Sequence, residues 1–238
     1  MALPDTDEVH LWAVDLARTE DEVNALAATL SAEELRRAAE MRMEVPRRRW
    51  LVARAGLRAL LAAYLDLEPG AVVLAQSRHG KPRLEPRSPL RFSVTHSEEL
   101  ALVACASDRE VGVDVEWAGR PRDSVGIARR WLADAERAAI EEAPASERGA
   151  AFYRHWVAKE AFVKATGRGI GASLRSFEVS LTGPGGPRLM HVGGDELEAM
   201  RWSLELLDLP GGYVAAVVVE AGARTRPLAA FDPLAHST

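Results

Sequence analysis

Helical and extended patterns follow one another in blocks, and this order constrains the fold more than any other feature of the sequence. Helical spacing of apolar residues dominates residues 31–64 and 124–166. Short β-rich runs, separated by Gly, Pro, Ser and Asp, dominate residues 72–116 and 176–219. Helices followed by strands, twice over, indicate an α+β fold made of two similar halves.

The predicted boundaries follow local signals. With 238 residues the chain is long enough for two small domains, and we expect an N-terminal half at 1–117, a C-terminal half at 118–221 and a flexible tail at 222–238. Ser31-Ala-Glu-Glu34 has the form of a capping box and predicts a helix that runs to about Met43. A second helix is expected at about 149–166, ended by Gly167.

Composition excludes several classes of protein. An apolar fraction of 47% excludes a wholly disordered chain, and the longest apolar runs, such as Leu100–Ala106, are too short to span a membrane. The acidic N-terminus lacks the order of a signal peptide, and the single cysteine, Cys105, allows no internal disulfide. We therefore expect a cytoplasmic protein without a membrane partner, and the net charge of −5 argues weakly against general nucleic-acid binding.

Arginine far outnumbers lysine in this chain, and the basic residues are concentrated in one stretch. The chain has 27 Arg and only three Lys, which are Lys81, Lys159 and Lys164. A lysine ammonium is a compact charge that an arginine fork does not replace at a tight site, so each lysine is a candidate functional residue. Residues 35–58 hold eight Arg and two Glu, a local charge of +6 that indicates either a solvated helix face or a phosphate site.

Two carboxylates share one face of the predicted strand Val111–Glu116. Strand alternation puts Asp114 and Glu116 on the same side, about 6–7 Å apart at Cα. Oxygen ligands at this spacing suit Mg²⁺, which binds few protein carboxylates and keeps its waters. The alternative is an ordinary strand with its polar face in water.

A stripe of three side chains follows on the helix predicted at 149–166. Trp156, Glu160 and Lys164 are spaced i, i+4 and i+8. Glu160 and Lys164 are in the favourable order for a simple helix ion pair. The functional alternative is a third carboxylate or general base, together with a lysine for phosphate.

Two shorter motifs are less specific alone. His79-Gly80-Lys81-Pro82 suits a turn, or a loop whose glycine lets a ligand approach the backbone. Phe92-Ser-Val-Thr95-His96-Ser97 ends a strand in hydroxyls and one histidine, which could equally be structural.

The four motifs together, in this order, resemble those of the Sfp-type 4′-phosphopantetheinyl transferases. That family carries Gly-Lys-Pro, Phe-x-x-Ser/Thr-His-Ser, Gly-x-Asp-x-Glu and Trp-x-x-Lys-Glu-x-x-x-Lys-x-x-Gly-x-Gly, found here at residues 80–82, 92–97, 112–116 and 156–169. The resemblance implies a pseudo-dimer of two α+β halves, with coenzyme A bound in the cleft between them. It also implies a monomer that acts on an acyl or peptidyl carrier protein.

The resemblance also implies roles for single residues. It places Asp114, Glu116 and Glu160 on Mg²⁺, and makes Glu160, Lys164 and Lys159 the residues that handle the proton and the phosphates. The residues that it implies for coenzyme A binding are Arg37, Arg49, Gly80, Lys81, Pro82, Thr95 and His96.

One position departs from the family pattern. A family lysine near the start of the first helix falls on Glu34 here, so another basic residue must complete the 3′-phosphate site. Arg36, Arg47 and Arg48 are the candidates.

The expected reaction is Mg²⁺-dependent transfer of the 4′-phosphopantetheine arm to a carrier serine, with release of adenosine 3′,5′-bisphosphate. Two alternatives stay open on the residues alone. The same carboxylates could serve a Mg²⁺-dependent phosphodiesterase or nuclease. The arginine-rich helix could instead be a nucleic-acid-binding module without catalysis.

Overall fold

The structure is a computed structural model that describes residues 1–119, 123–169 and 173–236. Its helices are α1 (Glu20–Ala27), α2 (Ala32–Ala39), α3 (Glu44–Leu65), α4 (Ser124–Trp131), α5 (Asp134–Glu142), α6 (Arg148–Thr166) and α7 (Glu196–Met200). Its strands are β1 (Glu8–Asp15), β2 (Leu74–Gln76), β3 (Pro82–Leu84), β4 (Leu90–Ser97), β5 (Leu100–Ser107), β6 (Val111–Trp117), β7 (Phe177–Ser180), β8 (Arg188–Val192), β9 (Trp202–Leu209), β10 (Tyr213–Glu220), β11 (Arg224–Thr225) and β12 (Ala229–Ala230). Short 3₁₀ segments are η1 (Pro69–Ala71), η2 (Leu174–Ser176), η3 (Pro210–Gly212) and η4 (Pro233–His236).

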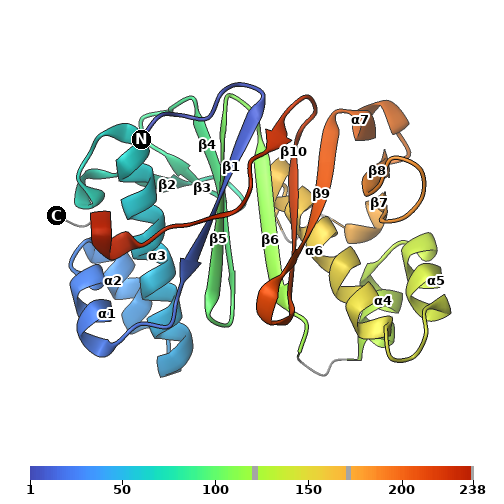
Figure 1. The fold of residues 1–238 in the computed structure, drawn as a ribbon, viewed down its shortest axis with the longest axis horizontal. Helices are drawn as coiled ribbons and strands as arrows, with labels where there is room; N and C mark the ends of the chain where they lie inside the picture. The colour runs from blue at the N-terminus through green and yellow to red at the C-terminus, as the bar shows by residue number, and fades with distance from the viewer. Residues whose placement is uncertain (120–122, 170–172, 237–238) are drawn as a thin grey trace.

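The first sheet has the strand order β11-β1-β5-β4, with β12 also paired to β1. Helix α3 covers its outer face (Figure 1), and the core between them contains fully buried side chains such as Leu57, Leu60 and Leu61 on the helix and Val14 on β1. Burial of one apolar helix stripe against one sheet face accounts for this layer.

The second sheet has the order β6-β10-β9, and α6 covers its outer face (Figure 1). Phe152, Val157 and Phe162 of α6 form the core of this layer together with Ala216 and Val218 of β10. Gly167 ends α6 in a left-handed conformation, as predicted.

The inner faces of the two sheets pack on each other. Buried apolar residues, among them Leu102, Ala104, Val113 and Val217, fill the space between the sheets. The molecule therefore has four layers, helix–sheet–sheet–helix, and the predicted α+β class is confirmed.

The two sheets meet where β4 runs beside β6, and serine hydroxyls join the strands there. Ser93 Oγ accepts a hydrogen bond from the Val113 amide at 3.1 Å, and Ser97 Oγ accepts one from the Trp117 amide at 3.1 Å. These bonds satisfy main-chain donors that a neighbouring strand would otherwise satisfy. This seam between the sheets places the last residues of β4 beside Asp114 and Glu116.

The start of α2 and the burial of Cys105 agree with the sequence-based predictions, whereas the end of α2 and the sheet that contains β6 differ from them. The Ser31 capping box is present, but α2 ends at Ala39 instead of about Met43. Cys105 is fully buried, as an apolar strand predicts. Strand β6 was expected in the first half, yet it is paired with β10, so it lies in the second sheet. How the chain divides into folding units stays a prediction.

The expected flexible tail is wrong for most of its length. Arg224–Thr225 and Ala229–Ala230 both pair with β1, and Phe231 is buried in the first core. Figure 1 shows this segment crossing back from β10 to the side of α3. Each of the two paired segments is only two residues long, which is too short to give a periodic signal in the sequence. Residues 237–238, and residues 120–122 of the predicted linker, lie outside the described residues.

No helix among the described residues is both long enough and apolar enough to cross a membrane.

Candidate active site

A cavity of about 300 Å³ brings together the three carboxylates singled out in the sequence. It is lined by Asp114 and Glu116 from β6, Glu160 and Trp156 from α6, Trp131 from α4, and Leu174 from η2. Glu160 is more than 40 positions from Asp114 in sequence, so the fold brings together carboxylates from distant segments. The stripe of Trp156 and Glu160 faces this cavity, as helical spacing predicted.

Asp114 is held by two partners. The Thr95 hydroxyl donates to Asp114 Oδ1 at 2.9 Å, and the Lys164 ammonium donates to the same oxygen at 2.6 Å. Asp114 is buried, so the lysine charge partly offsets the cost of removing the carboxylate from water. The Thr95 hydroxyl thus holds Asp114 in place, and its expected position beside coenzyme A stays a prediction.

Ser97 is a site residue that the sequence analysis did not assign. Its hydroxyl donates to Glu116 Oε2 at 3.1 Å across the seam between β4 and β6. Ser93, Thr95 and Ser97 alternate on one face of β4. That run of hydroxyls was a usable signal that this face meets polar groups.

Glu160 has a pKa raised above its usual value. Desolvation is the main cause, and the negative charges of Asp114 and Glu116 act in the same direction, whereas Lys164 opposes them. A carboxylate with a raised pKa is closer to the basicity that proton transfer at neutral pH requires.

The donor set fits a hard divalent cation in its chemistry. Three carboxylates face one cavity, and a cation between them would relieve the repulsion that adds to desolvation in raising the pKa of Glu160. Within the described residues, no three Asp, Glu, His or Cys side chains are already close enough to hold a metal ion. The carboxylates would therefore have to move closer together around the ion.

The two lysines of α6 have different surroundings. Lys164 pairs with Asp114 rather than with Glu160, so the simple helix ion pair is not the arrangement observed. Lys159 points into the core, is fully buried and pairs with Glu136. The expectation that Lys159 contacts phosphates is therefore corrected, because helix rotation turns it away from the stripe of Trp156, Glu160 and Lys164.

Arg49, on α3, lies near the turn between β4 and β5, just beyond the Ser97 end of the seam. Its guanidinium pairs with Glu98 at 2.8 Å and also contacts Glu99. His96 is close by, and although its side chain reaches solvent, partial desolvation and the charges of Lys164 and Arg49 lower its pKa. Neutral His96 can donate one hydrogen bond to an anion.

Arg37 is exposed and lies over the ring of Trp50, 5.6 Å from the ring centre. Two of the three candidates for the missing family lysine, Arg36 and Arg48, already have partners. Arg36 pairs with Glu40 at 2.7 Å, and Arg48 donates to the Arg18 carbonyl at 2.9 Å.

Glu34 has a structural role of its own. Its carboxylate accepts from Arg58 at 2.7 Å and also pairs with Arg54. Arg58 is itself buried and donates to the Pro69 carbonyl at 2.7 Å and the Val72 carbonyl at 2.9 Å. Three of the eight arginines of the arginine-rich stretch, Arg49, Arg54 and Arg58, therefore pair with glutamates outside it, which a local charge count cannot show.

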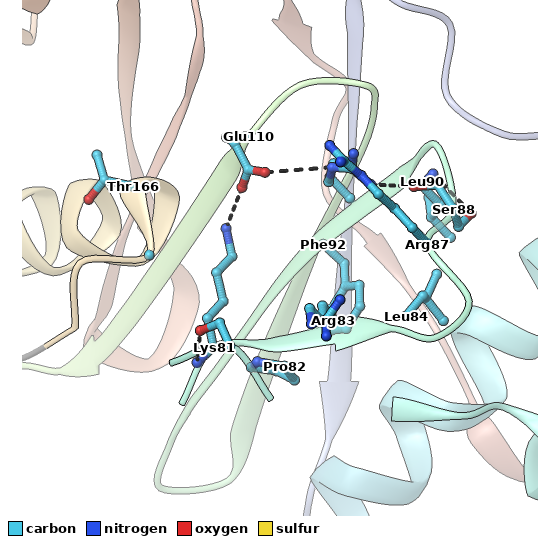
Figure 2. Close-up of a pocket in the computed structure, with 13 residues that line it drawn as sticks. Lys81, Pro82, Arg83, Leu84, Arg87, Ser88, Leu90, Phe92, Glu110 and Thr166 are labelled. Atoms are coloured by element: carbon cyan, nitrogen blue, oxygen red, sulfur yellow. Dashed lines mark hydrogen bonds and ion pairs between the residues drawn. The ribbon is translucent and has the colours of Figure 1, made fainter. Parts of the chain in front are cut away.

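The Gly80-Lys81-Pro82 loop borders a second cavity, of about 460 Å³ (Figure 2). Gly80 has a φ of +85°, which suits glycine in this turn. Lys81 Nζ donates to Glu110 Oε2 at 2.8 Å and to the Val111 and Ala165 carbonyls at 3.2 Å. The side chain thus joins the loop to β6 and α6, and Pro82 begins β3.

The family model described as the 4′-phosphopantetheinyl transferase superfamily matches residues 110–218. The 4′-phosphopantetheinyl transferase HetI of Nostoc sp. (strain PCC 7120) is 38% identical over 217 residues, which cover 90% of this chain and 88% of HetI. The 4′-phosphopantetheinyl transferase psf-1 of Bacillus pumilus is 28% identical over 177 residues, which cover 74% of this chain and 75% of psf-1. Among solved structures, the holo-[acyl-carrier-protein] synthase of Neisseria meningitidis matches with a TM-score of 0.37 and 25% identity, over 47% of this chain and 96% of that chain.

Proposed function

Because this chain belongs to the 4′-phosphopantetheinyl transferase superfamily, and is therefore a transferase, we propose that it moves the phosphopantetheine arm of coenzyme A to a carrier-protein serine. The observation that carries the proposal is the cavity where Asp114, Glu116 and Glu160 meet beside Lys164. We also propose that the protein acts as a monomer and that nucleic acid is not its substrate.

The proposed reaction is a displacement at the β-phosphorus of coenzyme A. The serine oxygen of the carrier forms the new P–O bond, and adenosine 3′,5′-bisphosphate leaves with the electron pair of the broken P–O bond. Glu160 accepts the serine proton, directly or through a water, and its raised pKa suits that task. Lys164 holds Asp114 and stands where it could contact the phosphates.

Asp114, Glu116 and Glu160 would hold Mg²⁺ in this proposal. When bound, the ion would stabilise the negative charge that develops on the pyrophosphate. Thr95 and Ser97 keep Asp114 and Glu116 facing the cavity through their hydrogen bonds.

The basic groups around the turn between β4 and β5 are proposed to bind the nucleotide end of coenzyme A. Arg49 and His96 are assigned to the 3′-phosphate, and Gly80, Lys81 and Pro82 to the adenine side. Arg37 is a further candidate because it is exposed and carries no carboxylate partner among the interactions described above.

Mass spectrometry of candidate apo-carriers, incubated with coenzyme A, Mg²⁺ and this protein, tests the reaction. The expected result is a gain of one phosphopantetheine per carrier, and none on a carrier whose acceptor serine is replaced by alanine. Unmodified carriers together with hydrolysis of an oligonucleotide or phosphodiester would support the nuclease alternative.

Replacing Arg49 or His96 by alanine is expected to weaken binding of coenzyme A more than that of dephospho-coenzyme A. Loss of a charge-assisted contact costs about 1.5–3 kcal/mol, and only coenzyme A carries the 3′-phosphate. Calorimetric titration of both ligands measures the difference. Equal weakening of the two ligands would show that neither residue recognises the 3′-phosphate.

A second variant should change the affinity for coenzyme A in the opposite direction to Arg49→Ala. Glu99→Gln removes a negative charge that now competes for Arg49, so coenzyme A should bind up to about fivefold more tightly. Glu141→Gln removes the exposed partner of Arg129 in the other half of the molecule and should leave binding unchanged.

A further inference from the structure

A pair of oppositely charged side chains lies buried directly behind the proposed active site. Lys159 precedes Glu160 on α6, and neither Lys159 nor Glu136 exposes any of its side chain. The lysine ammonium donates to both oxygens of Glu136, at 2.6 and 2.7 Å, and to the Phe177 carbonyl at 2.7 Å. An ammonium has three protons, so these contacts use its full donor capacity.

Glu136 connects three elements through one carboxylate. Besides Lys159 on α6, it accepts from the Ala133 amide at the start of α5, at 2.9 Å, and from the Val179 amide of β7, at 2.8 Å. The Phe177 ring lies 4.2 Å from the ammonium. The pair therefore fixes where α6 stands relative to α5 and β7.

Burial of an ion pair does not by itself explain its presence. The desolvation of two charges can cancel their attraction, so packed apolar residues can be equally stable in the same place. What the pair does supply is a unique geometry, because the contacts of Lys159 allow only one rotation of α6. Successive residues of a helix are about 100° apart, so the inward direction of Lys159 determines that Glu160 faces the cavity.

The Lys159–Glu136 pair is also linked to the wall of the cavity formed by Trp131. Trp131 ends α4, and two residues later Ala133 caps α5, where Glu136 holds its amide. A change at Glu136 would thus shift both the wall that carries Trp131 and the helix that carries Glu160.

We propose that Lys159 and Glu136 are positioning residues of the transferase reaction, which together orient Glu160 toward the carrier serine. This inference rests on the proposed function. It assigns no contact with substrate to either residue.

The test compares the kcat and KM of variants in which the Lys159–Glu136 pair is made neutral or its carboxylate is shortened. Lys159→Met with Glu136→Gln removes both charges while leaving an amide oxygen for a main-chain donor. We expect kcat for phosphopantetheine transfer to fall by on the order of 10²-fold, the effect of an ångström-scale misplacement, with KM for coenzyme A changed less than about threefold. Arg154→Met with Asp208→Asn removes an exposed ion pair between the same helix and β9, and it should change neither constant.

Combination with Glu160→Gln separates positioning from general structural damage. If the pair acts through Glu160, neutralising it in the Glu160→Gln background should lower the rate little further. The proposal would be overturned if the rate losses of the neutral pair and of Glu160→Gln multiplied in full in the combined variant. A wild-type kcat for Lys159→Met with Glu136→Gln would also overturn it. Absence of transfer by the wild-type protein would instead refute the proposed function.

Glu136→Asp covers the case in which the neutral variant does not fold. It keeps both charges and withdraws the carboxylate by one methylene, so α6 must shift to keep its contact. The expected result is again a lower kcat with little change in KM, and an unchanged kcat would contradict the inference.

Discussion

Glu160→Gln should bind coenzyme A and Mg²⁺ almost normally and yet transfer phosphopantetheine ~10²–10⁴ times more slowly, the range for loss of a general base. Glutamine keeps the shape and one oxygen that can still bind a cation, but it cannot take a proton from the carrier serine. Single-turnover rates with an apo-carrier, together with calorimetric binding of coenzyme A, measure the two effects separately. Glu141→Gln, on an exposed part of α5, is the matched control.

Asp114 gives the contrasting result. Asp114→Asn keeps the oxygen that accepts from Thr95 but removes the charge next to Lys164. We expect transfer to fall and to recover in part at high Mg²⁺ concentration, because added metal can compensate for a weakened ligand but not for a missing base. If Glu160→Gln is the variant rescued by Mg²⁺, Glu160 is chiefly a ligand and the proton goes elsewhere. A wild-type rate for Glu160→Gln without added metal would exclude both roles.

Gly112→Ala should damage both stability and transfer. A Cβ at residue 112 would overlap the Ala161 carbonyl oxygen and the Ala165 amide nitrogen, which are main-chain atoms of α6. Neither atom can rotate away, so α6 must move off β6. Overpacking of this kind costs ~3 kcal/mol or more, which lowers Tm by about 6–12 °C in a chain of this size.

The loss of transfer should exceed what unfolding explains, because the same shift carries Glu160 away from Asp114. Thermal melts and rates measured well below Tm distinguish the two effects. Gly149→Ala is the control on the same helix, since a Cβ there meets open space and should not lower Tm. A Gly112→Ala protein with wild-type Tm would mean that α6 does not pack on β6 as described.

The parts of the site predicted correctly are those set by local periodicity. Strand alternation placed Asp114 and Glu116 on one face, and helical spacing placed Trp156 and Glu160 on one stripe. The same spacing separates Lys159 from that stripe, so its burial was readable in the sequence. The family motif, which contains all three α6 residues, hid that distinction.

The parts predicted incorrectly depend on contacts between distant segments. Arg49 meets Glu98 and Glu99, and Arg58 meets Glu34, across gaps of 24 to 50 residues. A charge count over a short stretch of sequence does not include partners that are so distant along the chain. Helix α1 was not predicted, although its capping box, Thr19 to Glu22, has the same form as the Ser31 to Glu34 box that did predict α2.

The return of the chain to β1 has a consequence for association between molecules. Strand β5 covers one side of β1, and β11 and β12 cover the other, so the main-chain amides and carbonyls of β1 are paired on both sides along much of its length. A strand left open at the edge of a sheet is a template onto which a second chain can add its own strand. Strands β11 and β12 therefore protect the first sheet against edge-to-edge aggregation. A variant truncated after β10 would leave the backbone amides and carbonyls on that side of β1 unpaired and open to a strand from a second molecule.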